Sequence, residues 1–450
     1  MELKRKIYQK LIDWKKQEGK TALLLKGARR VGKSFIVEKF AKENYRSYLL
    51  IDFSLVDEEV ERIFLHNRQK LDDFFLLLKT YYSVELYERE SLIIFDEVQR
   101  FPTAREFIKA LVKDGRYDYI ETGSLLSIKQ NVDSIVIPSE EESLTMQPMD
   151  FEEFLWALGD EVSFANIKVL FEQRKPVGEA VHRKMMLLFR QYLLVGGMPQ
   201  AVLKYLQTKD FSKVDKVKRN ILKLYREDVA RYAKGYEDKV RSIFDSIVGM
   251  LSSSSKKMVF SNLGDKSSRF RDYETSFLWL SDAMITNDCY LCTDPNVGLS
   301  IAKDSSSVKC YMADTGLLVT MMIADNEEST NDFYKQLLFG KLSINEGMLM
   351  ENAVAQMLRA SGHSLFFYEK ASKDKEERME IDFLISKGSN VKMKLFPIEV
   401  KSGRNYTYSS LDKFKRKFSE RIGGRYLFHD KDLQKKEDIL LLPLYMAPFV

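Results

Sequence analysis

This 450-residue sequence contains few cysteines, which cross-link secreted proteins as disulfides, and few histidines, which often bind metals. It has three cysteines and four histidines. Three cysteines suit a reducing cytosol better than a disulfide framework. Cys289 and Cys292 are spaced as C-x-x-C, but no second pair lies nearby, so the sequence predicts a strand there and not zinc ligands. The histidines lie far apart along the chain, and we assign none of them to a metal.

Long apolar runs and a strong excess of one charge are missing too. No run approaches the roughly 20 residues that a membrane span needs, and the richest, Met185 to Val195, is interrupted by Arg190 and Gln191. Residues 1–18 read as an amphipathic helix and not as a signal peptide. We therefore expect a cytoplasmic protein with no membrane partner. The formal charge of +5 neither requires nor excludes a polyanionic partner.

What is present near the N-terminus is a complete phosphate-binding loop. Residues 27–34 fit G-x-x-x-x-G-K-[ST] and lie between an apolar strand and a helix. In this context the backbone N–H groups wrap the β-phosphate, and the helix N-terminus adds its dipole. We expect Lys33 to reach the β- and γ-phosphates and the Ser34 hydroxyl to ligate Mg²⁺. The expected nucleotide-binding residues of the loop are Gly27, Ala28, Arg29, Arg30, Val31, Gly32, Lys33 and Ser34.

Polar residues follow two further apolar strands. Asp96 and Glu97 come directly after the run 92–95, at the edge where open α/β sheets bind ligands. We expect Asp96 to hold Mg²⁺ through its water shell and Glu97 to orient or deprotonate the attacking water. The next strand ends in Thr122-Gly123-Ser124. The hydroxyls of Thr122 and Ser124 are expected to sense the γ-phosphate, although this tripeptide is also ordinary turn chemistry.

In this order the three motifs resemble the AAA+ branch of P-loop ATPases. Two further stretches resemble motifs of a prokaryotic group of AAA+ proteins. They are Pro-Met-Asp-Phe at 148–151 and Gly-Gly-Met-Pro at 196–199. Members of that group carry a C-terminal region of uncharacterised function, designated DUF4143. The resemblance implies an ATPase that uses ATP and Mg²⁺, with an arginine finger supplied by a neighbouring subunit. The candidate fingers are Arg100, Arg105, Arg116 and Arg226.

The pattern of strands and helices predicts four domains. Residues 1–155 alternate strand and helix, as a parallel sheet flanked by helices does. Residues 156–235 are helical and would form a lid, in which the Gly196-Gly197 pair is either a hinge or a plain turn between helices. Residues 236–330 contain helices followed by two strands, which suggests a winged-helix segment that binds DNA or serves as a protein interface. The last domain is 331–450.

A second acidic constellation lies in that last domain. The runs 379–385 and 396–403 read as neighbouring strands, with Asp382 on the first and with Glu399 and Lys401 on one face of the second. Asp382 and Glu399 are placed to hold a divalent ion. Lys401 would polarise the attacking water or stabilise the phosphorane.

This spacing resembles the D…E-x-K core of the PD-(D/E)xK nuclease fold. The family pattern adds an acidic residue on a preceding helix, and Glu351 fits that place better than Glu346. Glu380-Ile381 departs from the pattern, because a proline often precedes the aspartate. The resemblance implies a restriction-endonuclease-like α/β domain with Glu351, Asp382 and Glu399 as metal ligands. Such folds also persist as binding platforms, so binding without cleavage stays an alternative.

These patterns combine into one expected fold class and two hypotheses. The fold class is α/β: a P-loop parallel sheet of the AAA+ type, a helical lid, a winged-helix-like segment and a restriction-endonuclease-like C-terminal domain. The leading hypothesis is an ATP-hydrolysing protein whose nucleotide state controls a C-terminal module that acts on DNA. The alternative is a nucleotide switch in signalling or defence whose module binds a partner without cutting. DNA and a second copy of the chain are the candidate partners besides ATP.

Overall fold

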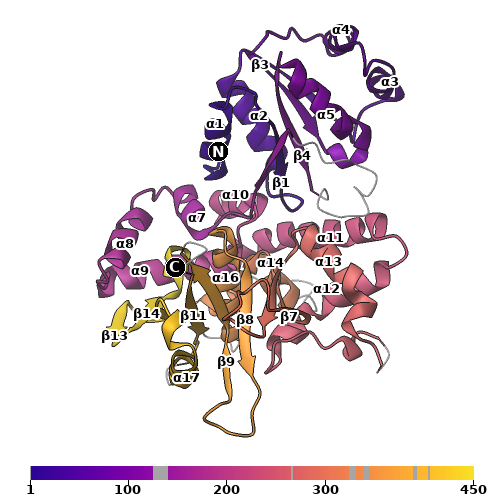
Figure 1. The fold of residues 1–450 in the computed structure, drawn as a ribbon. Coiled ribbons are helices and arrows are strands. Elements are labelled where there is room, and N and C mark those ends of the chain that lie inside the picture. The colour runs from indigo at the N-terminus through magenta and orange to yellow at the C-terminus, as the bar shows by residue number, and fades with distance from the viewer. Residues whose placement is uncertain are drawn as a thin grey trace. The chain divides into compact units, whose positions relative to one another are not determined.

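The computed structural model describes residues 2–124, 140–264, 267–323, 331–338, 345–388, 393–403 and 406–450 (Figure 1). Contacts group the chain into two compact units. The first comprises residues 2–147 with 282–284, and the second comprises residues 148–281 and 285–450. The segments expected as lid, winged helix and nuclease-like domain therefore all belong to the second unit.

The first unit is a parallel sheet between helices. Its strands are β1 (Ala22–Lys26), β2 (Ser47–Asp52), β3 (Ser91–Asp96), β4 (Asp118–Gly123) and β5 (Glu141–Thr145). Its helical segments are α1 (Ile7–Lys15), α2 (Lys33–Asn44), α3 (Glu58–His66), α4 (Leu71–Tyr82), the 3-10 turn η1 (Val98–Arg100) and α5 (Pro102–Asp114). All strand pairs are parallel, in the order β2-β3-β4-β1-β5. This confirms the parallel sheet predicted from the sequence.

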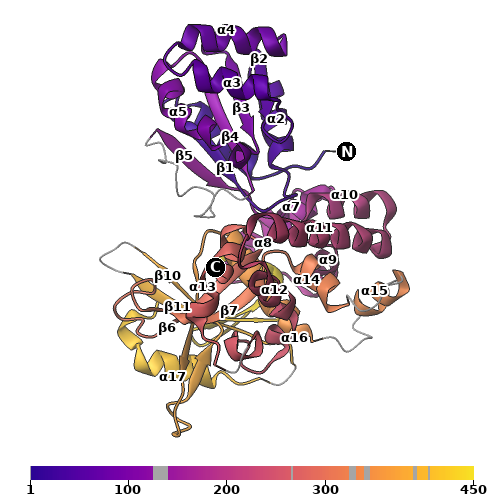
Figure 2. The ribbon, with the colours of Figure 1, turned by 90° about the vertical axis from the view of Figure 1, so that its right-hand side faces the viewer.

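The strands of this sheet are apolar because both of their faces are covered. Leu24, Ile93 and Phe95 enter a core that also contains Phe64 of α3 and Phe107 of α5. Helix α2 packs on β2, β3 and β4 from the opposite face (Figure 2). The loops that follow β1, β3 and β4 are therefore anchored on a rigid sheet, and these loops carry the predicted nucleotide motifs.

The second unit combines helices with two mixed sheets. Its helical segments are α7 (Phe151–Ala157), α8 (Ser163–Glu172), α9 (Glu179–Val195), α10 (Pro199–Thr208), α11 (Phe211–Tyr232), α12 (Glu237–Ser252), η2 (Phe260–Asn262), α13 (Phe270–Asp282), α14 (Thr315–Met322), α15 (Asn331–Leu338), α16 (Glu346–Ala360), α17 (Ser409–Lys417), η3 (Ser419–Arg421) and η4 (Leu444–Phe449). Among the described residues, no helix is both long enough and apolar enough to span a bilayer.

One sheet has the order β10-β11-β12-β14-β13 and the other β7-β6-β8-β9. The strands are β6 (Thr286–Cys292), β7 (Lys303–Met312), β8 (Leu365–Lys370), β9 (Met379–Ile381), β10 (Phe383–Lys387), β11 (Lys394–Val400), β12 (Arg425–His429), β13 (Gln434–Lys436) and β14 (Ile439–Pro443). Cys289 and Cys292 lie in β6, as predicted.

The β6–β7 hairpin corrects the expected winged-helix segment. The two strands pair antiparallel, as a wing would. However, β6 also pairs in parallel with β8, with Cys289 opposite Leu365. This pairing leaves Cys289, Val308 and Cys310 fully buried. The hairpin is therefore half of a four-stranded sheet that includes strands from the expected nuclease-like domain, and it is not a separate wing.

The predicted strand 379–385 is broken at Asp382. Strand β9 ends at Ile381 and pairs with β8, whereas β10 begins at Phe383 and pairs antiparallel with β11. Asp382 therefore lies where the chain passes from one mixed sheet to the other. Helix α16 contacts β7 and β11, and α17 contacts β9 and β11, so both helices pack on strands around this point.

The Gly-Gly-Met-Pro stretch joins α9 to α10 at a crowded junction. A Cβ atom on Gly197 would overlap the carbonyl oxygen of Met149, and one on Gly196, whose φ is +82°, would overlap the Asp314 carboxylate. Asp314 Oδ2 accepts a hydrogen bond from Gly197 N at 2.5 Å, and Met149 N donates to Gly197 O at 2.7 Å. These contacts favour a packed interhelical turn over a hinge.

Candidate functional site

The phosphate loop lies at the carboxyl end of β1, and its two glycines are required by its shape. Gly32 caps α2 with φ +96°, in the left-handed region that glycine adopts without strain. A Cβ atom on Gly27 would overlap the carbonyl oxygen of Met146, just after β5. The loop therefore passes so close to the backbone after β5 that position 27 has no room for a side chain.

Lys33 lies over this loop. Its Nζ donates to the carbonyl oxygens of Gly27 and Ala28 at 2.9 and 3.1 Å, and the residue is 6% exposed. The next residue, Ser34, donates its hydroxyl to Asp96 Oδ1 at 3.0 Å. The structure thus brings together the two motifs that are 62 residues apart in the sequence.

Asp96 is the meeting point of three segments. It is the last residue of β3, and its Oδ1 also accepts a hydrogen bond from the hydroxyl of Thr122 near the end of β4. Ser124, just beyond β4, is buried. Hydroxyl and carboxylate oxygens are the hard ligands that Mg²⁺ prefers, with nucleotide phosphates and waters completing its shell. Ser34 and Asp96 therefore fit a magnesium ion bound together with a nucleotide.

Glu97 is held in an unusual backbone conformation. Its φ of +52° is left-handed, which is costly for a residue with a side chain. Its Oε2 accepts a hydrogen bond from Gln99 Nε2 at 2.5 Å. This conformation turns the chain away from β3 directly after Asp96, so Glu97 does not extend the strand.

Arg5 also stabilises the phosphate loop, and the sequence motifs do not reveal it. Its guanidinium donates to the carbonyl oxygens of Val31 at 2.9 Å and Gln147 at 2.6 Å. It thereby ties the loop to the segment after β5. Arg5 precedes α1, and no motif in the sequence marks it, so this role is visible only in three dimensions.

The candidate arginine fingers are in different environments. Arg105 is an internal residue: its side chain is 3% exposed, 2.7 Å from Glu141 and 3.8 Å from Glu121. Burial raises the pKa of Glu121 well above its ordinary value, and Glu141 adds to that shift. The expectation for Arg105 is therefore corrected, because a side chain enclosed between two carboxyl groups does not reach another subunit. Arg116 pairs with Asp114 and Asp72, and Arg226 pairs with Asp245.

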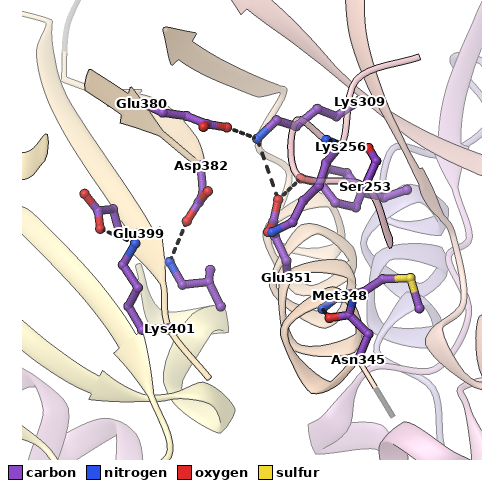
Figure 3. A network of polar contacts seen from close by, with 12 residues as sticks. Ser253, Lys256, Lys309, Asn345, Met348, Glu351, Glu380, Asp382, Glu399 and Lys401 are labelled. Atoms are coloured by element: carbon purple, nitrogen blue, oxygen red, sulfur yellow. Dashed lines mark hydrogen bonds and ion pairs between the residues drawn. The ribbon is translucent and has the colours of Figure 1, made fainter. Parts of the chain in front are cut away.

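The second predicted site is assembled where the two mixed sheets meet (Figure 3). Asp382 Oδ2 accepts a hydrogen bond from Val400 N at 2.9 Å, and Lys401 Nζ lies 2.7 Å from Glu399 Oε2. Glu399 is 2% exposed. Its Oε1 has no hydrogen-bond partner among the residues that the structure describes. The structure thus brings together Asp382, just before β10, and Glu399 and Lys401, at the end of the neighbouring β11.

Glu351 is drawn into a different set of contacts. It lies on α16, as predicted, but its carboxylate contacts the Lys256 ammonium, and Lys309 Nζ is 3.8 Å away (Figure 3). The Tyr311 hydroxyl also donates a hydrogen bond to it. Lys309 also pairs with Glu380 at 2.9 Å. Among the described residues, no group of three or more acidic, histidine or cysteine side chains is arranged to hold a metal ion.

These contacts change the titration of the site. Burial raises the pKa of Glu399 to about 7, against the opposing effect of Lys401. Burial disfavours the charged form of Lys401, but Glu399 and Asp382 outweigh it and raise its pKa. The pKa of Lys309 is raised in the same way, chiefly by Glu351 and Asp382. The lysines therefore stay charged at neutral pH and compensate the carboxylates around them.

The sequence did not indicate Lys256, Lys309 or Tyr311 as part of this site. Lys256 follows a run of serines that is typical of a solvated turn, and Lys309 and Tyr311 lie in β7. The basic helix α17 has polar partners of its own within the domain. Lys415 pairs with Asp438, Arg416 pairs with Glu376, and Lys417 donates to the Tyr368 hydroxyl. These partners favour an amphipathic packing helix over a phosphate-binding one.

Three parts of the chain match protein families. Residues 19–155 match a family described as AAA domain. Residues 186–328 and 346–446 match families described as domains of unknown function, DUF8612 and DUF4143 respectively. No curated protein matches the sequence. The AAA match confirms the predicted P-loop ATPase class for the first unit. The DUF4143 match confirms the predicted DUF4143 region in the C-terminal part of the chain, and the function of this family is unknown.

Several solved structures are similar over much of the chain. A Walker-type ATPase of Pyrococcus abyssi is 14% identical over 72% of this chain and 96% of its own, with a TM-score of 0.44. The Thermotoga maritima RuvB Holliday junction branch migration motor is 13% identical over 65% and 90%, with a TM-score of 0.30. Cdc6p from Pyrobaculum aerophilum is 12% identical over 75% and 94%, with a TM-score of 0.26. These TM-scores are too low to carry a conclusion about this chain.

Proposed function

We propose that the first unit binds ATP with Mg²⁺ and hydrolyses it. The observation that carries this is the position of Asp96, which accepts hydrogen bonds from the hydroxyls of Ser34 and Thr122 beside the loop that Lys33 covers. The bonds of Lys33 to two loop carbonyls can be exchanged for bonds to β- and γ-phosphate oxygens. Ser34 and Asp96 are the residues that would hold the metal.

Each residue then has a separate task. Mg²⁺, when bound, neutralises the charge that develops on the phosphate oxygens. The loop N–H groups and Lys33 position the triphosphate, and burial of the site strengthens these electrostatic contacts. Glu97 accepts the proton of the attacking water or orients that water. Its bond to Gln99 holds the carboxylate near the end of β3.

The test separates binding from turnover. Glu97→Gln should bind ATP as the wild type does but should hydrolyse it at least about 100-fold more slowly, because the group that activates water is lost and the metal ligand is kept. ATP affinity is measured by titration calorimetry and turnover by phosphate release. Gln99→Ala is the matched control for the neighbouring contact and should slow turnover much less. Equal rates for Glu97→Gln and wild type would refute the assignment.

We further propose that the nucleotide state of this ATPase controls a C-terminal module that acts on nucleic acid. In this module Asp382 lies just before β10, and Glu399 and Lys401 lie at the end of the neighbouring β11, in the D…E-x-K order. The ion pairs of Glu351 with Lys256 and Lys309 favour a module that binds its target without cutting, because the third carboxylate of a metal site is already compensated. The helices α8 to α11, within residues 156–235, are the proposed lid.

A second candidate is metal-dependent phosphodiester cleavage by this module. The buried Oε1 of Glu399, which has no partner among the described residues, favours it, because a metal ion would satisfy that oxygen. Asp382 and Glu399 would then hold the ion, with Lys401 stabilising charge on the phosphate. Lys401→Ala should retain the metal and slow cleavage by about 100-fold or more.

The two candidates are separated by cleavage of supercoiled plasmid and single-stranded oligonucleotides in Mg²⁺ or Mn²⁺, with and without ATP. Cleavage by the wild type that is lost in Asp382→Ala, with ATP hydrolysis unchanged, would establish the nuclease. Binding without cleavage of either substrate would establish the recognition module. Neither binding nor cleavage would refute the nucleic-acid assignment altogether.

A further inference from the structure

A cationic cleft opens beside Lys401. It has a volume of about 860 Å³, and its lining includes four lysines and two tyrosines: Lys401, Tyr406, Tyr408, Lys431, Lys435 and Lys436. Among the described residues that line it, none is acidic. Four ammonium groups around one cleft favour a ligand with several negative charges. Lys401 connects the cleft to the acidic centre, because its Nζ is 2.7 Å from Glu399.

The fold explains why these residues converge. Strands β11 and β12 run parallel, so their carboxyl ends lie at the same edge of the sheet. Lys401 follows β11, and Lys431 lies just beyond β12. Lys435 and Lys436 are on β13, which pairs antiparallel with β14 at the border of the sheet. Ligands commonly bind at the carboxyl ends of strands in α/β sheets. Lys401 and Lys431 lie at this edge, and Lys435 and Lys436 line the same cleft from the border strand.

The aromatic rings of the cleft are held by the lysines. Lys436 Nζ lies 4.7 Å from the ring centroid of Tyr408, and Lys431 Nζ lies 5.9 Å from that of Tyr406. The Tyr406 hydroxyl is hydrogen-bonded to His429 Nδ1 at 2.9 Å, which fixes the ring. Each ammonium is therefore near the π face of a tyrosine. A base can take that place by stacking, which releases the ammonium to pair with a phosphate.

We propose that this cleft binds single-stranded nucleic acid, with bases on Tyr406 and Tyr408 and phosphates on Lys431, Lys435 and Lys436. The inference rests on the proposed action of the C-terminal module on nucleic acid and specifies its substrate form. Tyrosines interleaved with lysines are suited to a single strand, because its bases are exposed for stacking. In a duplex the bases are already stacked and paired, and the rings do not reach them. The bound nucleic-acid strand would extend from the cleft to Lys401 and Glu399.

The experiment measures fluorescence anisotropy of labelled oligonucleotides with the full chain, in EDTA so that cleavage cannot occur. The probes are oligo-dT and oligo-U of about 12 nucleotides and a duplex of the same length. The single strands should bind more tightly than the duplex. A preference between oligo-dT and oligo-U tells whether DNA or RNA is the natural form, and equal affinity means that the cleft accepts both.

Two matched pairs of variants test the cleft itself. Tyr408→Leu should weaken binding about tenfold, whereas Tyr408→Phe keeps the stacking face and should bind as the wild type does. Lys435→Ala with Lys436→Ala should lower the slope of log affinity against log salt by about 1.4, about 0.7 for each lysine. Lys373→Ala with Lys375→Ala removes two exposed lysines that do not line the cleft and should leave affinity and slope near the wild-type values.

The outcomes keep this inference distinct from the proposed function. Tighter binding of the duplex, equal affinities for Tyr408→Leu and Tyr408→Phe, or equal effects of the two double-lysine variants would each overturn the cleft assignment. If the plasmid is cut but binding does not depend on the cleft, the nuclease stands and the inference fails. If single strands bind through the cleft and nothing is cut, the inference stands and the nuclease fails.

Discussion

The two sites of this chain use lysine and carboxylate in opposite ways. In the first unit, Lys33 donates to two backbone carbonyls of the phosphate loop, and Asp96 accepts from the hydroxyls of Ser34 and Thr122. In the second unit, lysines contact carboxylates directly, as Lys401 does with Glu399. Neutral partners are exchanged readily for phosphates and a metal, whereas an ion pair must be broken first. Lysine and carboxylate residues can therefore build a site that is ready to accept a ligand, or a site whose charges already neutralise one another, according to their partners.

The largest expected effect comes from removing Lys33 of the first site, and removal of Lys401 from the second site is the control. Lys33→Ala should lower the affinity for ATP by at least about 100-fold, because it removes the cation that faces the β- and γ-phosphates. Lys401→Ala should leave ATP affinity unchanged, because Lys401 belongs to the other unit. Titration calorimetry with ATP and Mg²⁺ on both variants gives the answer. A comparable loss in Lys401→Ala would break the distinction between the sites.

The pH dependence of stability tests the compensated site. Burial raises the pKa of Glu399 to about 7, from an ordinary value of 4.5. Between these values the folded protein keeps a proton that the unfolded chain releases, so raising the pH through this window lowers the free energy of unfolding. The loss from about pH 5.5 to about pH 8 should be about 2 kcal/mol. Glu399→Gln does not titrate and should lack this loss.

The measurement is the Tm of the wild type and Glu399→Gln at both ends of that range, in EDTA. Glu376→Gln is the control, because Glu376 is an exposed glutamate that pairs with Arg416 across the surface. It should show the wild-type pH dependence. If Glu399→Gln shows it too, Glu399 is not the group that titrates in this window.

The smallest expected effect concerns the packed glycine turn of the second unit. Gly197→Ala places a Cβ atom against the backbone of Met149 and should destabilise this unit by about 2 kcal/mol. Gly249→Ala, inside α12 with open space around the added atom, should be neutral or stabilising. Chemical denaturation of both variants provides the comparison. A Gly197→Ala protein as stable as Gly249→Ala would mean that the turn yields, as a hinge would.

The nucleotide site was predictable because its residues follow apolar strands at motif spacing. Lys33, Ser34, Asp96 and Thr122 meet because the carboxyl ends of parallel neighbours share one edge of the sheet. The contact of Arg5 with Gln147 O joins residues 142 apart and has no local signature. Interactions of that kind depend on the tertiary fold and leave no periodic trace.

The second site was predictable only in part, for the same reason. Asp382 lies just before β10, and Glu399 and Lys401 lie at the end of β11, which pairs with β10, so their meeting follows from local pattern. Lys256 contacts Glu351 from a turn 95 residues earlier in the chain. The β6–β8 pairing is likewise long-range, which explains why a hairpin that resembles a wing became part of a larger sheet.

The most direct test of the contrast between the two sites is to locate bound metal in a crystal structure of the full chain. Crystals grown with Mn²⁺ and a non-hydrolysable ATP analogue would show each ion by its anomalous scattering. We predict a Mn²⁺ ion beside Ser34 and Asp96, in contact with the nucleotide phosphates. We predict none at Asp382 and Glu399, because Lys401 pairs with Glu399, and Lys256 pairs with Glu351 on the neighbouring helix. An ion bound between Asp382 and Glu399 in the wild type, or none beside Ser34 and Asp96, would contradict the account.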